Sequence, residues 1–153
     1  QRQMCIRDRI NRLHSSSNPF CGKEPWNYPE PYCSDMEKIL RFRHALIPYM
    51  YTLNYRCHCE HIPVIIPMYY YYPFEEKAYS YKNQYFLGSE MLVCPVTTKI
   101  DEDSQKSGEE CFIPAGIWTD IFTGDVYNGG KNGKRQILCR NLQSIPVLGR
   151  AGE

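Results

Sequence analysis

The 153-residue sequence has almost no net charge, because 18 lysines and arginines stand against 17 aspartates and glutamates, which leaves +1 at pH 7. A domain that binds nucleic acid or an anionic membrane carries a clustered basic excess, and no such excess is present. The sequence also lacks any apolar run near the roughly 20 residues that a transmembrane helix needs. We therefore expect a globular protein with neither nucleic acid nor a membrane as partner.

Disulfide-scaffold spacing is also missing, although the sequence contains eight cysteines. Cys94 in "MLVCPV" and Cys139 in "QILCRNL" lie within apolar runs, where a thiol acts as a small hydrophobic side chain. Free thiols of this kind are typical of a reducing compartment. The cysteines therefore predict a cytoplasmic location. They are Cys5, Cys21, Cys33, Cys57, Cys59, Cys94, Cys111 and Cys139.

A zinc site is the alternative use of cysteine, and "CHCEH", residues 57–61, contains the right residue types. On a helix, however, Cys57 and His61 share a face while Cys59 points away. No second Cys/His cluster supplies the remaining ligands. We expect no metal and no other cofactor.

Neither end of the sequence has the character of a natural terminus. There is no initiator methionine, and "QRQMCIRDR", residues 1–9, has neither strand alternation nor a helical face. This string resembles translated adapter or primer DNA, and we expect residues 1–9 to be a non-native segment. A genuine polar segment is the alternative. The other end, "SIPVLGRAGE", stops within an expected strand, so the sequence predicts an internal fragment of a longer protein.

The central part of the sequence combines a helical pattern with a buried strand. Apolar residues recur at spacings of three and four from Asp35 to His61, and Ser34 or Asp35 is the expected N-cap. Pro48 removes a backbone donor and must kink or divide this helix. Residues 62–73, "IPVIIPMYYYYP", predict a strand buried on both faces, along which the tyrosines alternate between faces. A helix that feeds such a strand is typical of parallel α/β architecture.

After residue 88 the sequence becomes all-β. A strand is expected over residues 91–96, an exposed charged loop over residues 99–110, and a meander from residue 110 to residue 130, where "PAG", "TGD" and "NGG" signal turns. "RQILCRNL" and "IPVLGRAG" add two more strands. The sequence thus predicts an α/β part over residues 10–88 and a truncated β-domain over residues 89–153.

Near the N-terminus, "NRLHSSSNPFCGKEPWNY" reads as a surface loop in which Arg12 and His14 precede a tryptophan between prolines. Loops with polar groups above an aromatic floor often hold ligands. Trp26 with Tyr28 could form a platform on which a sugar ring stacks. The interpretation we favour for Trp26 is that it packs under its own loop.

Six segments of this sequence occur in one order: "RLHSS", "EPWNY", "RFRHALIPYMYTLNY", "PVIIPMYYYYP", "QYFLGSEMLVCPV" and "PAGIWTDIFTGDVYNGG". Together, over residues 10–153, they resemble the glycoside hydrolase family 31 α-glucosidases. The resemblance implies the last part of a (β/α)8 TIM barrel followed by an antiparallel β-sandwich domain. It also implies a retaining hydrolase that releases terminal α-linked glucose, or sometimes α-xylose, from the non-reducing end of oligosaccharides.

The same resemblance assigns substrate-binding residues. His14 matches the family histidine that hydrogen-bonds a hydroxyl of the released sugar, and Arg12 supports the loop. A neutral imidazole suits this role, because it both donates and accepts hydrogen bonds, as sugar hydroxyls do. The loop would lie at the C-terminal face of the barrel, where barrel enzymes keep their sites. The alternative is that His14 caps a turn.

The resemblance does not extend to the family's catalytic carboxyl groups. Retaining hydrolysis needs two carboxyl groups roughly 5 Å apart, and in the family both are aspartates upstream of the Arg-x-His, one in a Trp-x-Asp-Met-type motif. No such motif occurs here. We expect no catalytic residue in this chain and no activity from the chain alone. Outside the expected non-native segment, we interpret the aspartates as solvated residues of turns, of a loop and of a helix start: Asp35, Asp101, Asp103, Asp120 and Asp125.

Two other classes of function compete with the enzyme fragment. The β-rich half and the 13 tyrosines would suit a carbohydrate-binding β-domain without catalysis, since tyrosine fits half-buried surfaces and sugar sites. A structural or interaction domain is the third class. The helix that feeds a doubly buried strand argues against the binding module, because such modules seldom contain part of an α/β barrel.

Overall fold

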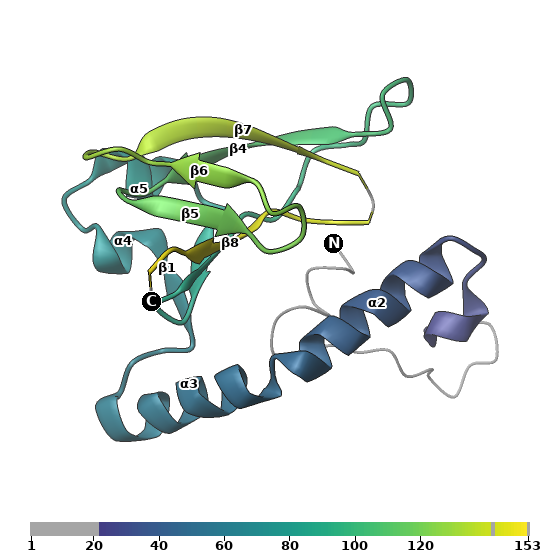
Figure 1. Ribbon diagram of the computed structural model, residues 1–153, viewed down its shortest axis with the longest axis horizontal. Coiled ribbons are helices and arrows are strands. Elements are labelled where there is room, and N and C mark those ends of the chain that lie inside the picture. The colour runs from purple at the N-terminus through teal and green to yellow at the C-terminus, as the bar shows by residue number, and fades with distance from the viewer. Residues whose placement is uncertain (1–21, 142, 153) are drawn as a thin grey trace. The chain divides into compact units, whose positions relative to one another are not determined.

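The computed structural model describes residues 22–141 and 143–152, and the chain folds as two compact units, Gln1–Glu60 and His61–Glu153. In the described residues the first unit is helical and the second is mostly β-sheet (Figure 1). The boundary lies earlier than the junction near Gly88 that the sequence predicted. None of the helices in the described ranges is long and apolar enough to cross a membrane.

The first unit confirms the divided helix. Its elements are the short 3-10 helix η1 (Pro25–Asn27) and the α-helices α2 (Tyr32–Ala45) and α3 (Ile47–Glu60). Figure 1 shows α2 and α3 following each other directly. The break falls at Leu46, two residues before Pro48, whose missing N–H and ring disrupt hydrogen bonding to the preceding turn. The buried side chains of Met36 and Ile39 on α2 form a small hydrophobic cluster in this unit.

The predicted N-cap of α2 is wrong. The helix begins at Tyr32 after Pro31, so Ser34 and Asp35 lie inside the first turn. The Glu30 carboxylate takes the capping role instead, accepting the Ser34 backbone N–H at 3.3 Å. Proline suits a helix start because its fixed φ is helical and its missing N–H would have no partner there.

In the described residues, the second unit contains ten elements. Its strands are β1 (Ile65–Pro67), β2 (Tyr85–Leu87), β3 (Met91–Val93), β4 (Ser107–Ile113), β5 (Ile117–Asp120), β6 (Val126–Asn128), β7 (Lys134–Arg140) and β8 (Val147–Arg150). Its helices are α4 (Met68–Tyr71) and α5 (Glu76–Ser80).

Six strands form one antiparallel sheet in the order β1-β2-β3-β8-β5-β6. The predicted long strand over residues 62–73 is wrong beyond Pro67, and β1 pairs with β2 antiparallel instead of joining a parallel βα pattern. Pro67 cannot donate to the ladder and becomes the N-cap of α4. The tyrosines after Met68 therefore lie on and just after a helix and do not alternate along a strand.

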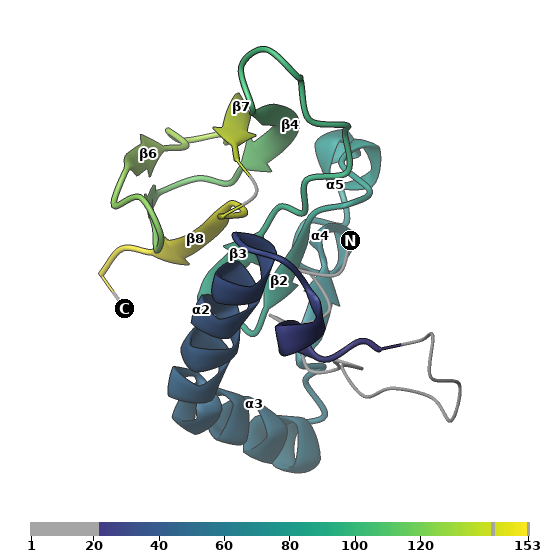
Figure 2. The same cartoon turned by 90° about the vertical axis from the view of Figure 1, so that its right-hand side faces the viewer.

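The strands β4 and β7 form a separate two-stranded sheet, with Ser107 opposite Arg140 and Ile113 opposite Lys134. They run side by side in Figure 2. The predicted loop over residues 99–110 is correct only to Lys106, because β4 begins at Ser107. Long-range pairing with β7 decides this boundary, which local charge cannot indicate.

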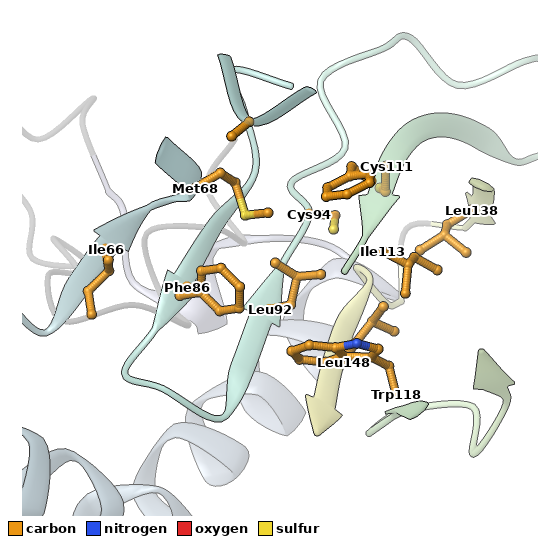
Figure 3. Packing of buried hydrophobic residues seen from close by; sticks show 12 residues of the cluster. Ile66, Met68, Phe86, Leu92, Cys94, Cys111, Ile113, Trp118, Leu138 and Leu148 are labelled. Carbon is orange, nitrogen blue, oxygen red and sulfur yellow. The ribbon is translucent and has the colours of Figure 1, made fainter. Parts of the chain in front are cut away.

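The main core lies in the second unit and joins residues of both sheets and of α4 (Figure 3). Trp118 is fully buried, and its indole Nε1–H donates to the Pro114 carbonyl at 3.1 Å. The buried side chain of Gln84 hydrogen-bonds the backbone of β4. It accepts the Phe112 N–H at 2.9 Å and donates to the Phe112 carbonyl. The Gln84 amide and the Phe112 peptide groups thus satisfy each other away from water.

Candidate functional site

His14 and Arg12, the predicted substrate-binding residues, lie outside the described residues. The described part of the same loop begins at Gly22 and leads into η1. The Glu24 carboxylate fixes this turn, accepting the Lys23 backbone N–H at 3.0 Å and the Asn27 side-chain amide at 2.8 Å. These two bonds are local side-chain contacts of the kind that stabilise a turn.

Trp26 lies on this turn with 75% of its surface exposed. The favoured interpretation, that Trp26 packs beneath its own loop, is therefore wrong. Pro25 and the hydrogen bond from the Tyr28 N–H to the Pro25 carbonyl, 3.1 Å, hold the turn so that the ring points away from local packing. An exposed indole face is a surface on which an apolar face of a ligand can stack.

The carboxyl groups of the chain do not all occupy solvated turns. Asp120, 1% exposed, forms a buried ion pair with the Arg140 guanidinium, which also donates to the Cys139 carbonyl at 2.8 Å. Burial works to lower the pKa of Arg140, but the hydrogen bonds with Tyr127 and Asp120 outweigh it and leave that pKa raised. The prediction of a solvated turn residue is wrong for Asp120, and also for Asp35, which is buried on α2.

The other three aspartates are exposed, as predicted. Asp101 accepts hydrogen bonds from the Ser104 hydroxyl and backbone N–H, and these bonds lower the pKa of Asp101. Asp125 accepts from the Thr123 hydroxyl at 2.8 Å. These contacts are turn-forming contacts, and they give Asp101 and Asp125 structural roles.

Two of the cavities among the described residues lie within the second unit. The larger, about 340 Å³, is lined by polar groups and two thiols, and at its edge the Tyr81 hydroxyl donates to Glu110 at 2.8 Å. Burial, followed by this hydrogen bond and the Glu110 charge, raises the pKa of Tyr81. The residues that line it are Ser80, Tyr81, Lys82, Asn83, Gln84, Cys94, Pro95, Glu109, Glu110 and Cys111.

The smaller cavity, about 290 Å³, is mainly aromatic. The Arg150 guanidinium lies 5.9 Å from the ring centroid of Trp118, within the range of a cation–π contact. Burial raises the pKa of Tyr72, and the positive charge of Arg150 partly offsets this. The lining residues are Tyr71, Tyr72, Phe86, Ser89, Trp118 and Arg150.

The cysteine- and histidine-rich segment lies at the end of α3. Cys57 is half-buried, Cys59 is exposed, and His61 follows the helix with a φ of 57°. Among the residues that the structure describes, no group of three or more His, Cys, Asp or Glu side chains could hold a metal ion. The buried Asp120–Arg140 pair carried no signal in the sequence, because its partners are far apart along the chain.

Comparison with known families gives two consecutive matches. The family described as glycosyl hydrolase family 31 C-terminal domain matches residues 61–153, and the TIM-barrel domain of glycosyl hydrolases family 31 matches residues 3–53. These matches confirm the predicted order of a barrel end followed by a β-domain. Their division agrees with the compact units of the structure.

Individual relatives point the same way. Neutral alpha-glucosidase C of Mus musculus is 34% identical over 143 residues, which cover 92% of this chain and 15% of that protein. The structure of the glucosidase II alpha subunit is 32% identical with a TM-score of 0.73, covering 84% of this chain and 14% of that one. An alpha-xylosidase from a soil metagenome, 24% identical, shares the fold with a TM-score of 0.79 over 99% of this chain and 24% of its own.

Proposed function

Because this chain belongs to glycoside hydrolase family 31, we propose that it is part of a retaining enzyme that hydrolyses terminal, non-reducing α-glucosidic bonds of oligosaccharides. The chain spans less than a fifth of the length of its α-glucosidase relatives. The proposal therefore concerns the longer enzyme.

The observation that carries the proposal is the pair of family matches in barrel-then-β order over nearly the whole chain. The alternative, a stand-alone carbohydrate-binding β-domain, does not account for residues 3–53, which match the barrel domain. Free thiols at all six cysteines that the structure describes support the cytoplasm as the location.

We propose His14 as the residue that hydrogen-bonds a hydroxyl of the bound sugar, with Arg12 as its support. The described end of the same loop supports this role, because Glu24 fixes the turn and Trp26 presents an exposed ring. A site for a pyranose needs both features: directional hydrogen bonds and an apolar face for the ring C–H groups.

The test is His14→Ala in the longer enzyme with an aryl α-glucoside. Loss of one sugar hydrogen bond should lower kcat/KM about 10- to 100-fold, which corresponds to roughly 1.4–2.8 kcal/mol. Ser104→Ala, in an exposed loop of the second unit, is the control and should leave kcat/KM unchanged. Unchanged kinetics in the His14 variant would remove the site assignment.

A second measurement addresses the catalytic groups. We propose that the two carboxyl groups of the retaining mechanism are contributed from outside this chain, since the Trp-x-Asp-Met-type motif is not in its sequence. The 153-residue chain should not hydrolyse an aryl α-glucoside, whereas the longer enzyme should. Turnover by the chain alone would overturn this. Comparing aryl α-glucoside with aryl α-xyloside in the longer enzyme decides which sugar is preferred.

A further inference from the structure

Two cysteines meet at the larger cavity of the second unit. Cys94 directly follows β3, and Cys111 lies in the middle of β4. Both side chains are 1% exposed, belong to the same core cluster and line the same cavity. Two thiols from distant parts of the chain thus share one surface.

The two thiols lie in the same part of the core, where Figure 3 labels both. Burial raises the pKa of the Cys94 thiol, and the Cys111 side chain adds to this effect. A thiol that serves only as a small hydrophobic group needs no second thiol in the wall of the same cavity, whereas Cys94 and Cys111 both line it. The proximity is therefore a specific feature of this core.

The pair spans two sheets that have no strand in common. The backbone N–H of Cys94 donates to the Pro146 carbonyl at 3.0 Å, and β3 belongs to the six-stranded sheet. Cys111 is opposite Gln136 in the β4–β7 sheet. A covalent bond between the sulfur atoms would connect the two sheets directly.

Metal binding does not explain the pair. Within the described ranges, no third Cys, His, Asp or Glu side chain completes a metal site with them. Two apposed thiols without a third ligand are suited to chemistry that uses two sulfur atoms, and the simplest is disulfide formation.

We propose that Cys94 and Cys111 are a redox pair that forms a reversible intramolecular disulfide with a small-molecule disulfide oxidant such as glutathione disulfide. One thiol loses its proton and attacks the oxidant, forming a mixed disulfide and releasing one glutathione thiolate. The second thiol loses its proton and displaces the other glutathione. The protein gives up two protons and two electrons, and the oxidant is reduced to two thiols.

The cavity beside the two buried thiols opens to solvent at its other end, because Lys82, Asn83 and Glu110 are exposed and line it. The proposal is independent of the glycosidase function, because it uses only residues of the second unit.

The test is oxidation of the reduced 153-residue chain with glutathione disulfide, followed by alkylation, tryptic digestion and mass spectrometry. Cleavage after lysine and arginine leaves Cys94 in peptide 83–99 and Cys111 in peptide 107–131, with no other cysteine in either. We expect these peptides to appear cross-linked, with a mass lower by two hydrogens than their reduced sum. Dithiothreitol should release them.

Variants separate this disulfide from random oxidation. Cys94→Ala and Cys111→Val replace each buried thiol by an apolar group, and each should abolish the cross-linked peptide while circular dichroism shows an unchanged fold. Cys139→Ser, at an exposed position of β7, should leave the cross-link intact. Separate alkylation of both peptides in the oxidised wild-type chain, or cross-links to other cysteines instead, would overturn the proposal.

Discussion

Asp120 shows how one buried side chain can organise a turn and a sheet edge together. Its Oδ1 accepts the backbone N–H groups of Phe122 and Thr123 at 2.8 and 3.0 Å, while its Oδ2 accepts from Arg140. The carboxylate thus meets three donors, which is what an ionised group away from water requires. Asp120 therefore has a structural role.

Replacing Asp120 by Ala should destabilise the second unit by about 3–5 kcal/mol, because it leaves the Arg140 guanidinium buried without its charged partner. The matched control is Glu110→Ala, which removes the surface pair with Arg135 and should cost less than about 1 kcal/mol. Urea unfolding followed by circular dichroism measures both. Equal losses in the two variants would contradict the structural role of the buried pair.

The thiol of Cys94 should react slowly with an alkylating reagent. Burial, together with the hydrogen bond and negative potential from Cys111 and the charge of Glu109, raises the pKa of Cys94 well above its ordinary value, despite the opposing charge of Arg140. Since the thiolate is the reactive form, a raised pKa means less of it at pH 8.

At pH 8, iodoacetamide should modify Cys94 at least about tenfold more slowly than exposed Cys139, and the Cys94 rate should keep rising as the pH increases. Mass spectrometry of peptides 83–99 and 136–140 over time gives both rates. In urea the two rates should converge. Equal rates in the folded chain would show that Cys94 is neither buried nor shifted.

Among the elements, the turn between β6 and β7 depends on close approach to the core. Gly133 has a φ of 72°, and a Cβ atom there would lie 2.2 Å from Cζ of the buried Phe112 ring. Gly124, in the turn between β5 and β6, has a φ of 77° but open space around it. A residue with a side chain would be strained at either position, because both have a positive φ. Only at Gly133 would its Cβ atom also clash with Phe112.

Gly124→Ala should therefore destabilise by about 1 kcal/mol, the cost of a left-handed conformation for an ordinary residue. Gly133→Ala should cost more than about 2 kcal/mol, because it adds overpacking against Phe112. Thermal or urea unfolding of the two variants gives the difference. If both lose the same stability, the turn can shift away from β4 without cost.

At the scale of the whole chain, the division into two units has a measurable consequence. β1 pairs with β2 in the main sheet, so residues 61–87 belong with the β-domain in space. Brief digestion with proteinase K should first cut near His61 and leave a resistant fragment that extends to the C-terminal region. N-terminal sequencing identifies its start. A fragment that begins near Gly88 would support the boundary predicted from the sequence instead.

Local patterns in the sequence determined the features that depend on near neighbours. The break at Pro48, the burial of Trp118, the strands near residues 91, 134 and 147, and the six motifs of the family all follow from spacing, turn residues and residue type. These features are decided within a few residues by hydrogen-bond loss at proline or by the period of apolar side chains.

Only the tertiary structure decided what depends on distant partners. The pairing of β1 with β2 turned an expected barrel strand into a short edge and a helix, and the pairing of β4 with β7 shortened the charged loop. The ion pair of Asp120 with Arg140 and the cavity wall that Cys94 shares with Cys111 bring together residues that are 17 or more positions apart. Composition fixes which groups are available, but burial and proximity assign their roles, because a charge or a thiol changes its chemistry only when a particular neighbour replaces water.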